Sequence, residues 1–223
     1  SLPVTDNTDC QAKGNTACKF WGLGSDGTVG ANKNSIKIIG DNTDLNAQAY
    51  FQYDSKKSGG VTISHLRFGP EPIRSSYYVT MSDFVACHNA SYLEKYPMVQ
   101  DCKPGGTFLI NCGYTLEELS GILPVEAKQY IAKNQVNVYT IDAVKIGKEL
   151  GLGTKYNMVL MSAFFKLANI IPIEDAVKYM KQACEDSYGK FGEETVQKNK
   201  NAVDAGLTGL VKLEIPADWA TTT

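Results

Sequence analysis

Hydrophobic positions along the chain switch between short strand-like runs and longer helix-like runs. Apolar, β-branched and aromatic runs bounded by glycine, proline and polar turns predict strands at 18–23, 47–53, 61–68, 77–81, 83–87, 107–112 and 136–141. Positions with a helical period predict helices at 28–39, 116–120, 125–133 and 143–150, and a short helix that Ser91 caps and that ends before Pro97.

The final third of the chain has a different pattern. Residues 157–205 are expected to be almost entirely helical, followed by a last strand at 210–215. The stretch 157–171 is apolar nearly all round, so we expect it in the interior or at an interface. Strands that alternate with helices indicate an α/β fold with three layers and a mostly parallel sheet. A Rossmann-like glycine turn follows the first strand, and the C-terminal third is helical.

Length, net charge and the longest apolar run indicate the domain organisation and exclude some classes of partner. The 223 residues suit one large domain, and the opening Ser-Leu-Pro without Met indicates a processed chain or a segment of a longer one. A net charge of -2 supplies no positive field for nucleic acid. The longest apolar run, 158–165, is too short to cross a bilayer, so we expect no membrane contact and a cytoplasmic location.

The spacing of the cysteine and histidine residues in the sequence does not match a metal-binding motif. The only histidines are His65 and His88, and no Cys-x-x-Cys occurs, so neither a zinc nor an iron–sulfur site is indicated. We expect mostly buried, reduced thiols. Cys87 and His88 resemble a nucleophile beside a base, but neighbours on an extended chain point apart. His65 is expected to pack within a strand, and we assign no catalytic residue.

The strongest chemical motif is Gly22-x-Gly24-x-x-Gly27, between the first strand and the first helix. Glycines allow a tight turn, and the N–H groups at a helix start attract phosphate. The candidate contacts are Gly24, Ser25, Asp26, Gly27 and Thr28, with Asn32 and Lys33 on the first helical turns. An ordinary tight turn between a strand and a helix remains the alternative.

A second candidate lies after the second strand. Asp54 is followed by Lys56, Lys57 and Ser58 in a turn that ends in two glycines. In dinucleotide sites this position contacts the adenosine ribose, and a basic residue there favours an additional phosphate. The candidate ligands are therefore NADP and coenzyme A, and a solvated turn without a ligand is an equal alternative.

Longer strings resemble one family. They are CKFWGLGSDGTVGANK at 18–33, YDSKKSGG at 53–60, SHLRFG at 64–69, VACHN at 85–89, NVYTIDAV at 137–144 and AFFKLA at 163–168. Together they resemble the gamma domain of pyruvate:ferredoxin (flavodoxin) oxidoreductases, over almost the whole chain.

The resemblance implies one part of an anaerobic enzyme that decarboxylates pyruvate, forms acetyl-CoA and passes two electrons to ferredoxin or flavodoxin. Residues 1–223 would then be a single gamma-type domain of a longer, homo-oligomeric enzyme, and inactive alone. Thiamine diphosphate and [4Fe-4S] clusters would belong to other domains, while this one helps to bind coenzyme A and to assemble the enzyme. A free-standing NADP-binding oxidoreductase domain and a structural assembly module without a ligand remain alternatives.

Overall fold

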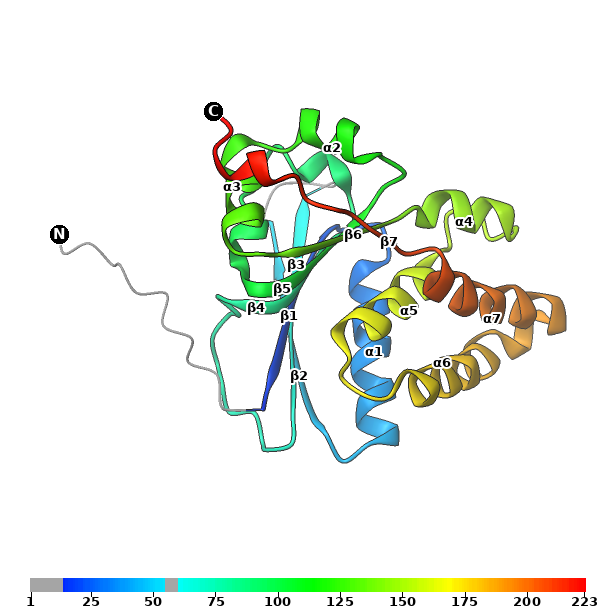
Figure 1. Cartoon of the computed structure of the whole chain (residues 1–223). Coiled ribbons are helices and arrows are strands. Elements are labelled where there is room, and N and C mark those ends of the chain that lie inside the picture. Colours follow the sequence, from blue (N-terminus) through cyan, green and yellow to red (C-terminus); the bar gives the residue numbers. More distant parts are fainter. Residues whose placement is uncertain (1–13, 55–59) are drawn as a thin grey trace.

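The computed structural model describes residues 14–54 and 60–223 as one mixed sheet with helices on both faces (Figure 1). The sheet has the strand order β2-β3-β1-β4-β5-β6-β7. The described strands are β1 Thr16–Leu23, β2 Asn46–Tyr53, β3 Val61–Gly69, β4 Ser82–Cys87, β5 Cys102–Asn111, β6 Asn137–Ile141 and β7 Val211–Lys212.

Most strands in this sheet run the same way. β1, β4, β5 and β6 pair in parallel as successive neighbours. β3 is antiparallel to both β1 and β2, so β2 has the direction of β1, and only β3 and the short β7 oppose the others among the described strands. The expected mostly parallel α/β sheet is confirmed, with an antiparallel strand inserted between β1 and β2.

The helices form the two outer layers, as expected. They are α1 Thr28–Asn42, α2 Leu116–Ile122, α3 Val125–Lys133, α4 Ala143–Glu149, α5 Asn157–Ala168, α6 Ile173–Tyr188 and α7 Glu193–Thr208. One sheet face packs against α1 and α5, with α6 and α7 outside them, while α2 and α3 cover the other face over β4 to β6 (Figure 1). The helical C-terminal third is thus confirmed.

Helix α5 is the centre of the larger core. Its residues from Met158 to Phe165 are all buried, which confirms that this apolar stretch is interior. The Phe164 ring lies 5.0 Å from the Phe20 ring of β1 and 5.2 Å from the Phe84 ring of β4. Fully burying one such side chain contributes about 1.5–3 kcal/mol, so this contact anchors the helical layer to the sheet.

Two predicted elements were wrong. Residues 77–81 form no strand: the Tyr78 ring stacks on His65 of β3 at 4.7 Å, so this aromatic segment covers the sheet face instead of pairing with an edge. Ser91 caps no helix. The side-chain oxygen of Asn89 accepts from the Ser91 N–H at 3.1 Å, and caps only a 3-10 turn at Ala90–Tyr92.

Strand ends also differ from the predictions. β5 begins at Cys102, five residues before the expected start, and the last strand shrinks from 210–215 to two residues. The five cysteines within the described residues are buried and free, as expected, and Cys10 lies outside them. None of the described helices is long and apolar enough to span a membrane.

Helices α5 and α7 approach so closely that only glycine fits at their contact. A Cβ on Gly206 would lie 2.4 Å from the Val159 carbonyl oxygen and 2.7 Å from the Ser162 Cβ. The Ser162 hydroxyl donates to the Val203 carbonyl at 2.5 Å, which holds the two helices together.

Gly206→Ala should therefore lower the free energy of unfolding by about 1–3 kcal/mol, because the helices must move apart. Gly40→Ala is the matched control, since Gly40 is also helical but its Cβ would meet nothing within 4 Å. That control should be neutral or slightly stabilising. Urea unfolding of the two variants measures both effects, and equal stabilities would contradict the packing argument.

Candidate functional site

The candidate site lies at the edge of the sheet where the parallel strands end. After β1 the chain turns toward β2 and β3 on one side, whereas β4 lies on the other side of β1. Ligands of open α/β sheets bind outside the carboxyl ends of the strands at such a switch point. The glycine turn after β1 and His88 after β4 meet here.

Two glycines of the motif are required by the shape of the turn. A Cβ on Gly22 would lie 2.4 Å from the Thr28 hydroxyl oxygen, so the chain passes too close to α1 for a side chain. Gly27 has φ +84°, a left-handed conformation that favours glycine. The spacing therefore produces the predicted tight turn between strand and helix.

Asp26 holds this turn together from within. Its carboxylate accepts from the N–H of Leu23 and from the N–H of Thr28, both at 2.8 Å. A carboxylate at a helix N-terminus is stabilised by the helix dipole. Asp26, which the sequence marks as a ligand contact, thus has an internal role in the structure.

Of the other backbone N–H groups in the glycine turn, some donate to carbonyl groups of the chain and some have no acceptor among the described residues. Gly24 donates to the Gly60 carbonyl at 3.2 Å, and Asp26 donates to the Leu23 carbonyl at 3.0 Å. Within the described part of the chain, no hydrogen bond uses the N–H groups of Ser25 and Gly27. Gly24 and Ser25 are also solvent-exposed, so the open donors lie at an accessible tip.

The Gly24–Gly60 hydrogen bond joins the glycine turn to the residue that precedes β3. Asp54 donates to the Val61 carbonyl at 3.1 Å, which closes the β2–β3 connection at this edge. Lys56, Lys57 and Ser58 lie outside the described residues.

The two helical candidates have different surroundings. Asn32 is 2% exposed, and its Nδ2 group has no hydrogen-bond partner. Lys33 is exposed, and its ammonium group lies 5.6 Å from the centre of the Phe51 ring on β2. Hence Lys33 extends toward the strand, while Asn32 stays in the interior.

His88 connects the glycine turn to the next strands. Its Nδ1 lies 2.9 Å from the Thr28 hydroxyl, and its carbonyl accepts from the Asn111 side chain at 3.3 Å. Burial lowers the pKa of His88 to about 4, against the opposing effect of Asp26. The imidazole is therefore neutral at physiological pH. The sequence offered no signal for this contact between distant segments.

Cys87 and His88 do not form a catalytic pair. The Cys87 thiol donates to the Asn89 carbonyl at 3.1 Å in the core beneath α2 and α3, whereas the His88 ring packs against Phe20 in the other core. Burial raises the pKa of Cys87 to about 12, so the thiol stays protonated. No group of three metal-ligating side chains occurs in residues 14–54 and 60–223.

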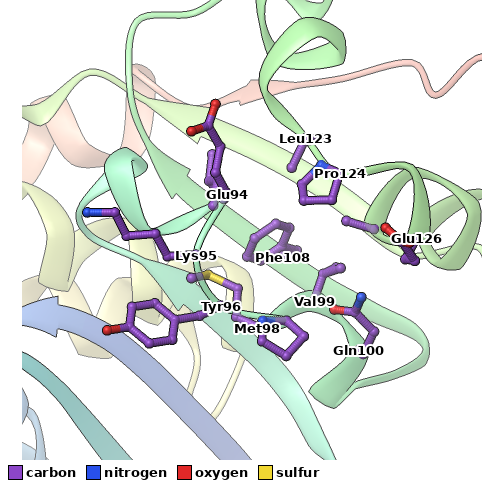
Figure 2. A pocket seen from close by; sticks show the side chains of 13 residues that line it. Glu94, Lys95, Tyr96, Met98, Val99, Gln100, Phe108, Leu123, Pro124 and Glu126 are labelled. Atoms are coloured by element: carbon purple, nitrogen blue, oxygen red, sulfur yellow. The ribbon is translucent and has the colours of Figure 1, made fainter. Parts of the chain in front are cut away.

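Two cavities flank the connection after β4. The first has a volume of about 400 Å³, lies beside the glycine turn and is lined by Trp21, Gln52, Tyr53, Asp54, Val61, Ile63 and Tyr96. The second, of about 270 Å³, is the pocket of Figure 2, between residues 93–100 and the start of α3. Its walls are mostly apolar, with Met98, Val99, Phe108 and Leu123 among them.

Comparison with known proteins identifies the family of this chain. The model of the pyruvate ferredoxin/flavodoxin oxidoreductase family matches residues 17–209. The chain belongs to this family. It is 56% identical over 220 residues to pyruvate-flavodoxin oxidoreductase of Enterobacter agglomerans, and 52% identical over 220 residues to pyruvate:ferredoxin oxidoreductase of Moorella thermoacetica. These matches cover 98% and 99% of this chain but 19% of each relative, so the chain spans about a fifth of their length.

A family relative with a different acceptor in its name is also similar. Pyruvate dehydrogenase [NADP(+)] of Cryptosporidium parvum is 51% identical over 197 residues, which is 88% of this chain and 10% of that protein.

Two solved structures have a similar fold. Pyruvate oxidoreductase subunit PORC of Thermotoga maritima superposes with a TM-score of 0.71 at 17% identity, covering 91% of this chain and all of that chain. The 2-oxoglutarate:ferredoxin oxidoreductase of Magnetococcus marinus gives 0.66 at 22% identity, covering 88% of this chain and 31% of that chain.

The buried histidines of this family member make its stability depend on pH. Burial lowers the pKa of both His65 and His88 from 6.5 to about 4. The unfolded chain therefore binds more protons between pH 6.5 and 4, and stability falls as pH falls through that range. Each histidine should remove up to about 2 kcal/mol at pH 5 relative to pH 8.

Urea unfolding of the chain at pH 5 to 8 measures this slope. His88→Gln should remove about half of it, whatever the variant does to stability at pH 8. An unchanged slope in that variant would show that other groups carry the acid sensitivity.

Proposed function

We propose that this domain helps to bind coenzyme A and to assemble an oxidoreductase that converts pyruvate and CoA into acetyl-CoA, CO₂, a proton and two electrons. Thiamine diphosphate and [4Fe-4S] clusters supply carbonyl-carbon chemistry and electron transfer from other parts of that enzyme. This chain contributes backbone donors and cations that bind and orient the CoA phosphates. The enzyme would be a cytoplasmic homo-oligomer that passes its electrons to ferredoxin or flavodoxin.

The observation that carries the proposal is the hydrogen bond from the Gly24 N–H to the Gly60 carbonyl. It joins the glycine turn, which has open donors at Ser25 and Gly27, to Gly60, and Lys56 and Lys57 precede Gly60 by four and three residues in the sequence. A ligand that has a phosphate chain and an additional phosphate on its ribose needs both the open N–H donors and the cationic side chains at one place. The exposed tip of the glycine turn fits a ligand that approaches from solvent or from a neighbouring domain.

The relatives favour CoA over an electron acceptor as the ligand. Their names differ in the acceptor, which is flavodoxin, ferredoxin or NADP(+), while all three name pyruvate. Because this chain is 51–56% identical to all three, we infer that its role does not follow the acceptor. The Magnetococcus marinus structure of similar fold holds 2-oxoglutarate, coenzyme A and succinyl-CoA, which agrees with a CoA role.

The two alternatives, an NADP-binding domain and a structural module without a ligand, require different features at the glycine turn. An NADP domain needs a place for nicotinamide beyond the glycine turn, where His88 is buried against the Thr28 hydroxyl and the Asp26 carboxylate accepts from the Thr28 N–H. A purely structural module would need no open donors at an exposed turn.

Lys56→Ala together with Lys57→Ala in the complete enzyme should raise the KM for CoA about tenfold or more. A charge-assisted contact between a lysine and the 3′-phosphate at a partly exposed site contributes at most about 1.5–3 kcal/mol, and the change removes it. Steady-state kinetics with CoA and with dephospho-CoA measures the effect, and dephospho-CoA should hardly respond. If the KM values for CoA and for dephospho-CoA rise equally, the lysines support the fold or a domain interface and do not bind the phosphate.

A further inference from the structure

Strand β2 forms one edge of the sheet, and its outer side has no partner strand among the described residues. The Asp54 N–H donates to the Val61 carbonyl, so positions 46, 48, 50 and 52 point their backbone groups toward β3. The backbone groups that point away from the sheet are those of Ala47, Ala49, Phe51 and Tyr53. Within the described part of the chain, no hydrogen bond uses these outward groups.

This edge lacks the features that normally keep a strand from pairing with another chain. Proteins protect their edges with charged side chains, proline, bulges or very short strands. The β2 sequence NAQAYFQY contains no charged residue and no proline, and it pairs with β3 in one unbroken register over eight residues. The opposite edge is protected, because β7 has only two residues and one of them is Lys212. An uncharged, regular edge of this length is a template for a further strand.

The two faces of β2 carry different side chains. Ala47 and Ala49 pack toward the core that α1 and α5 cover. The Phe51 ring is on the same face, 5.6 Å from the Lys33 ammonium group of α1. Tyr50 is on the other face and is 43% exposed. A strand that extends this sheet therefore has to match small and large side chains on the α1 face.

A second copy of β2 matches this edge in one antiparallel register. Outward backbone groups must meet outward groups, so odd positions have to lie opposite odd positions. With Tyr50 opposite Tyr50 of the second copy, Ala49 lies opposite Phe51. In the same register, Ala47 lies opposite Tyr53. Each alanine then has an aromatic ring across the interface, and such cross-strand pairs stabilise a sheet. A register centred on Ala49 would instead leave two alanines opposite each other.

The polar side chains of β2 fit the same register. The Val79 N–H donates to His65 Nδ1 at 3.1 Å, so the proton of this neutral imidazole is on Nε2. Nε2 lies 3.3 Å from Gln52 Oε1 and donates to it. The Gln52 amide therefore keeps its NH₂ group for an acceptor, and Gln48 of the second copy lies opposite Gln52. No like charges oppose each other along the paired strands.

We propose that two copies of this chain pair through β2, antiparallel and about a twofold axis at Tyr50, to form one continuous sheet. The contact is isologous, because the same strand is used by both copies. The inference goes beyond the CoA role of the domain, since it concerns assembly and uses a different surface from the glycine turn.

Sedimentation velocity of the 223-residue chain measures the association. The weight-average mass should rise from that of one chain toward that of two as the concentration increases. Ala49→Pro removes one outward N–H from each copy, so the Kd of the dimer should rise about tenfold or more. Proline is tolerated on an edge strand where its N–H side faces away from the sheet, so pairing with β3 is retained. Ala49→Ser keeps the N–H and is the matched control, which should associate like the original chain.

A cysteine cross-link tests the register and does not depend on the proline variant. Directly opposed residues that are not hydrogen-bonded have Cα atoms about 4.5 Å apart, which a disulfide can span. Tyr50→Cys should therefore give a covalent dimer on mild oxidation with copper phenanthroline. The five described cysteines are buried, and Cys10, outside the described residues, is replaced by Ser in this experiment.

Tyr53→Cys is the control for accessibility. Tyr53 is more exposed than Tyr50, at 60%, but in this register the two Tyr53 positions are about 20 Å apart along the strands. It should form little covalent dimer, whereas cross-linking by random collision would favour it. Equal cross-linking at both positions would overturn the register.

A chain that stays monomeric at every concentration would overturn the proposal. If the Ala49 and Phe51 amides were then protected from hydrogen exchange in the complete enzyme, a strand from another part of that enzyme would be the partner of β2. Mass and cross-linking report on this edge, while the KM for CoA reports on Lys56 and Lys57, so either proposal can fail without the other.

Discussion

The contact between helix α5 and the centre of the sheet determines where the other elements lie. Phe164 reaches Phe20 and Phe84 on two neighbouring parallel strands, and the buried faces of α1 and α7 complete the same core. The start of α5 is fixed by this packing, and the Asn157 side chain at that start lies 2.6 Å from where a Cβ on Gly27 would be. The shape of the glycine turn thus depends on the core beneath it.

A second constraint is the internal bonding of the turn itself. The Asp26 carboxylate takes two N–H groups, and His88 holds the Thr28 hydroxyl from the next strand. These contacts use part of the donor capacity of the helix start, and they hold the backbone of the turn in one conformation. The open donors of Ser25 and Gly27 therefore belong to a preorganised loop, and preorganisation lowers the entropic cost of the phosphate binding that we propose.

The antiparallel strand β3 gives this member of the family its arrangement at the carboxyl edge. Because β3 lies between β1 and β2, its beginning at Val61 meets both the glycine turn and the end of β2. The glycine turn and the cavity that Trp21 and Tyr96 line consequently lie at the same edge of the sheet. The chain spans about a fifth of the length of its relatives.

Local features could be predicted from the sequence because their causes are local. The glycine spacing at 22, 24 and 27 determined the tight turn, and the all-round apolar pattern of 157–171 determined a buried helix. The aromatic run at 77–81 was wrong as a strand, because whether a tyrosine pairs in a sheet or covers one depends on what lies beneath it.

The site itself depended on contacts between distant segments, which only the tertiary structure decided. Thr28 meets a histidine 60 positions later, and Tyr96 packs on Trp21 from a separate loop. Neither contact follows from periodicity, because it arises when the core brings separate strand ends to one edge of the sheet.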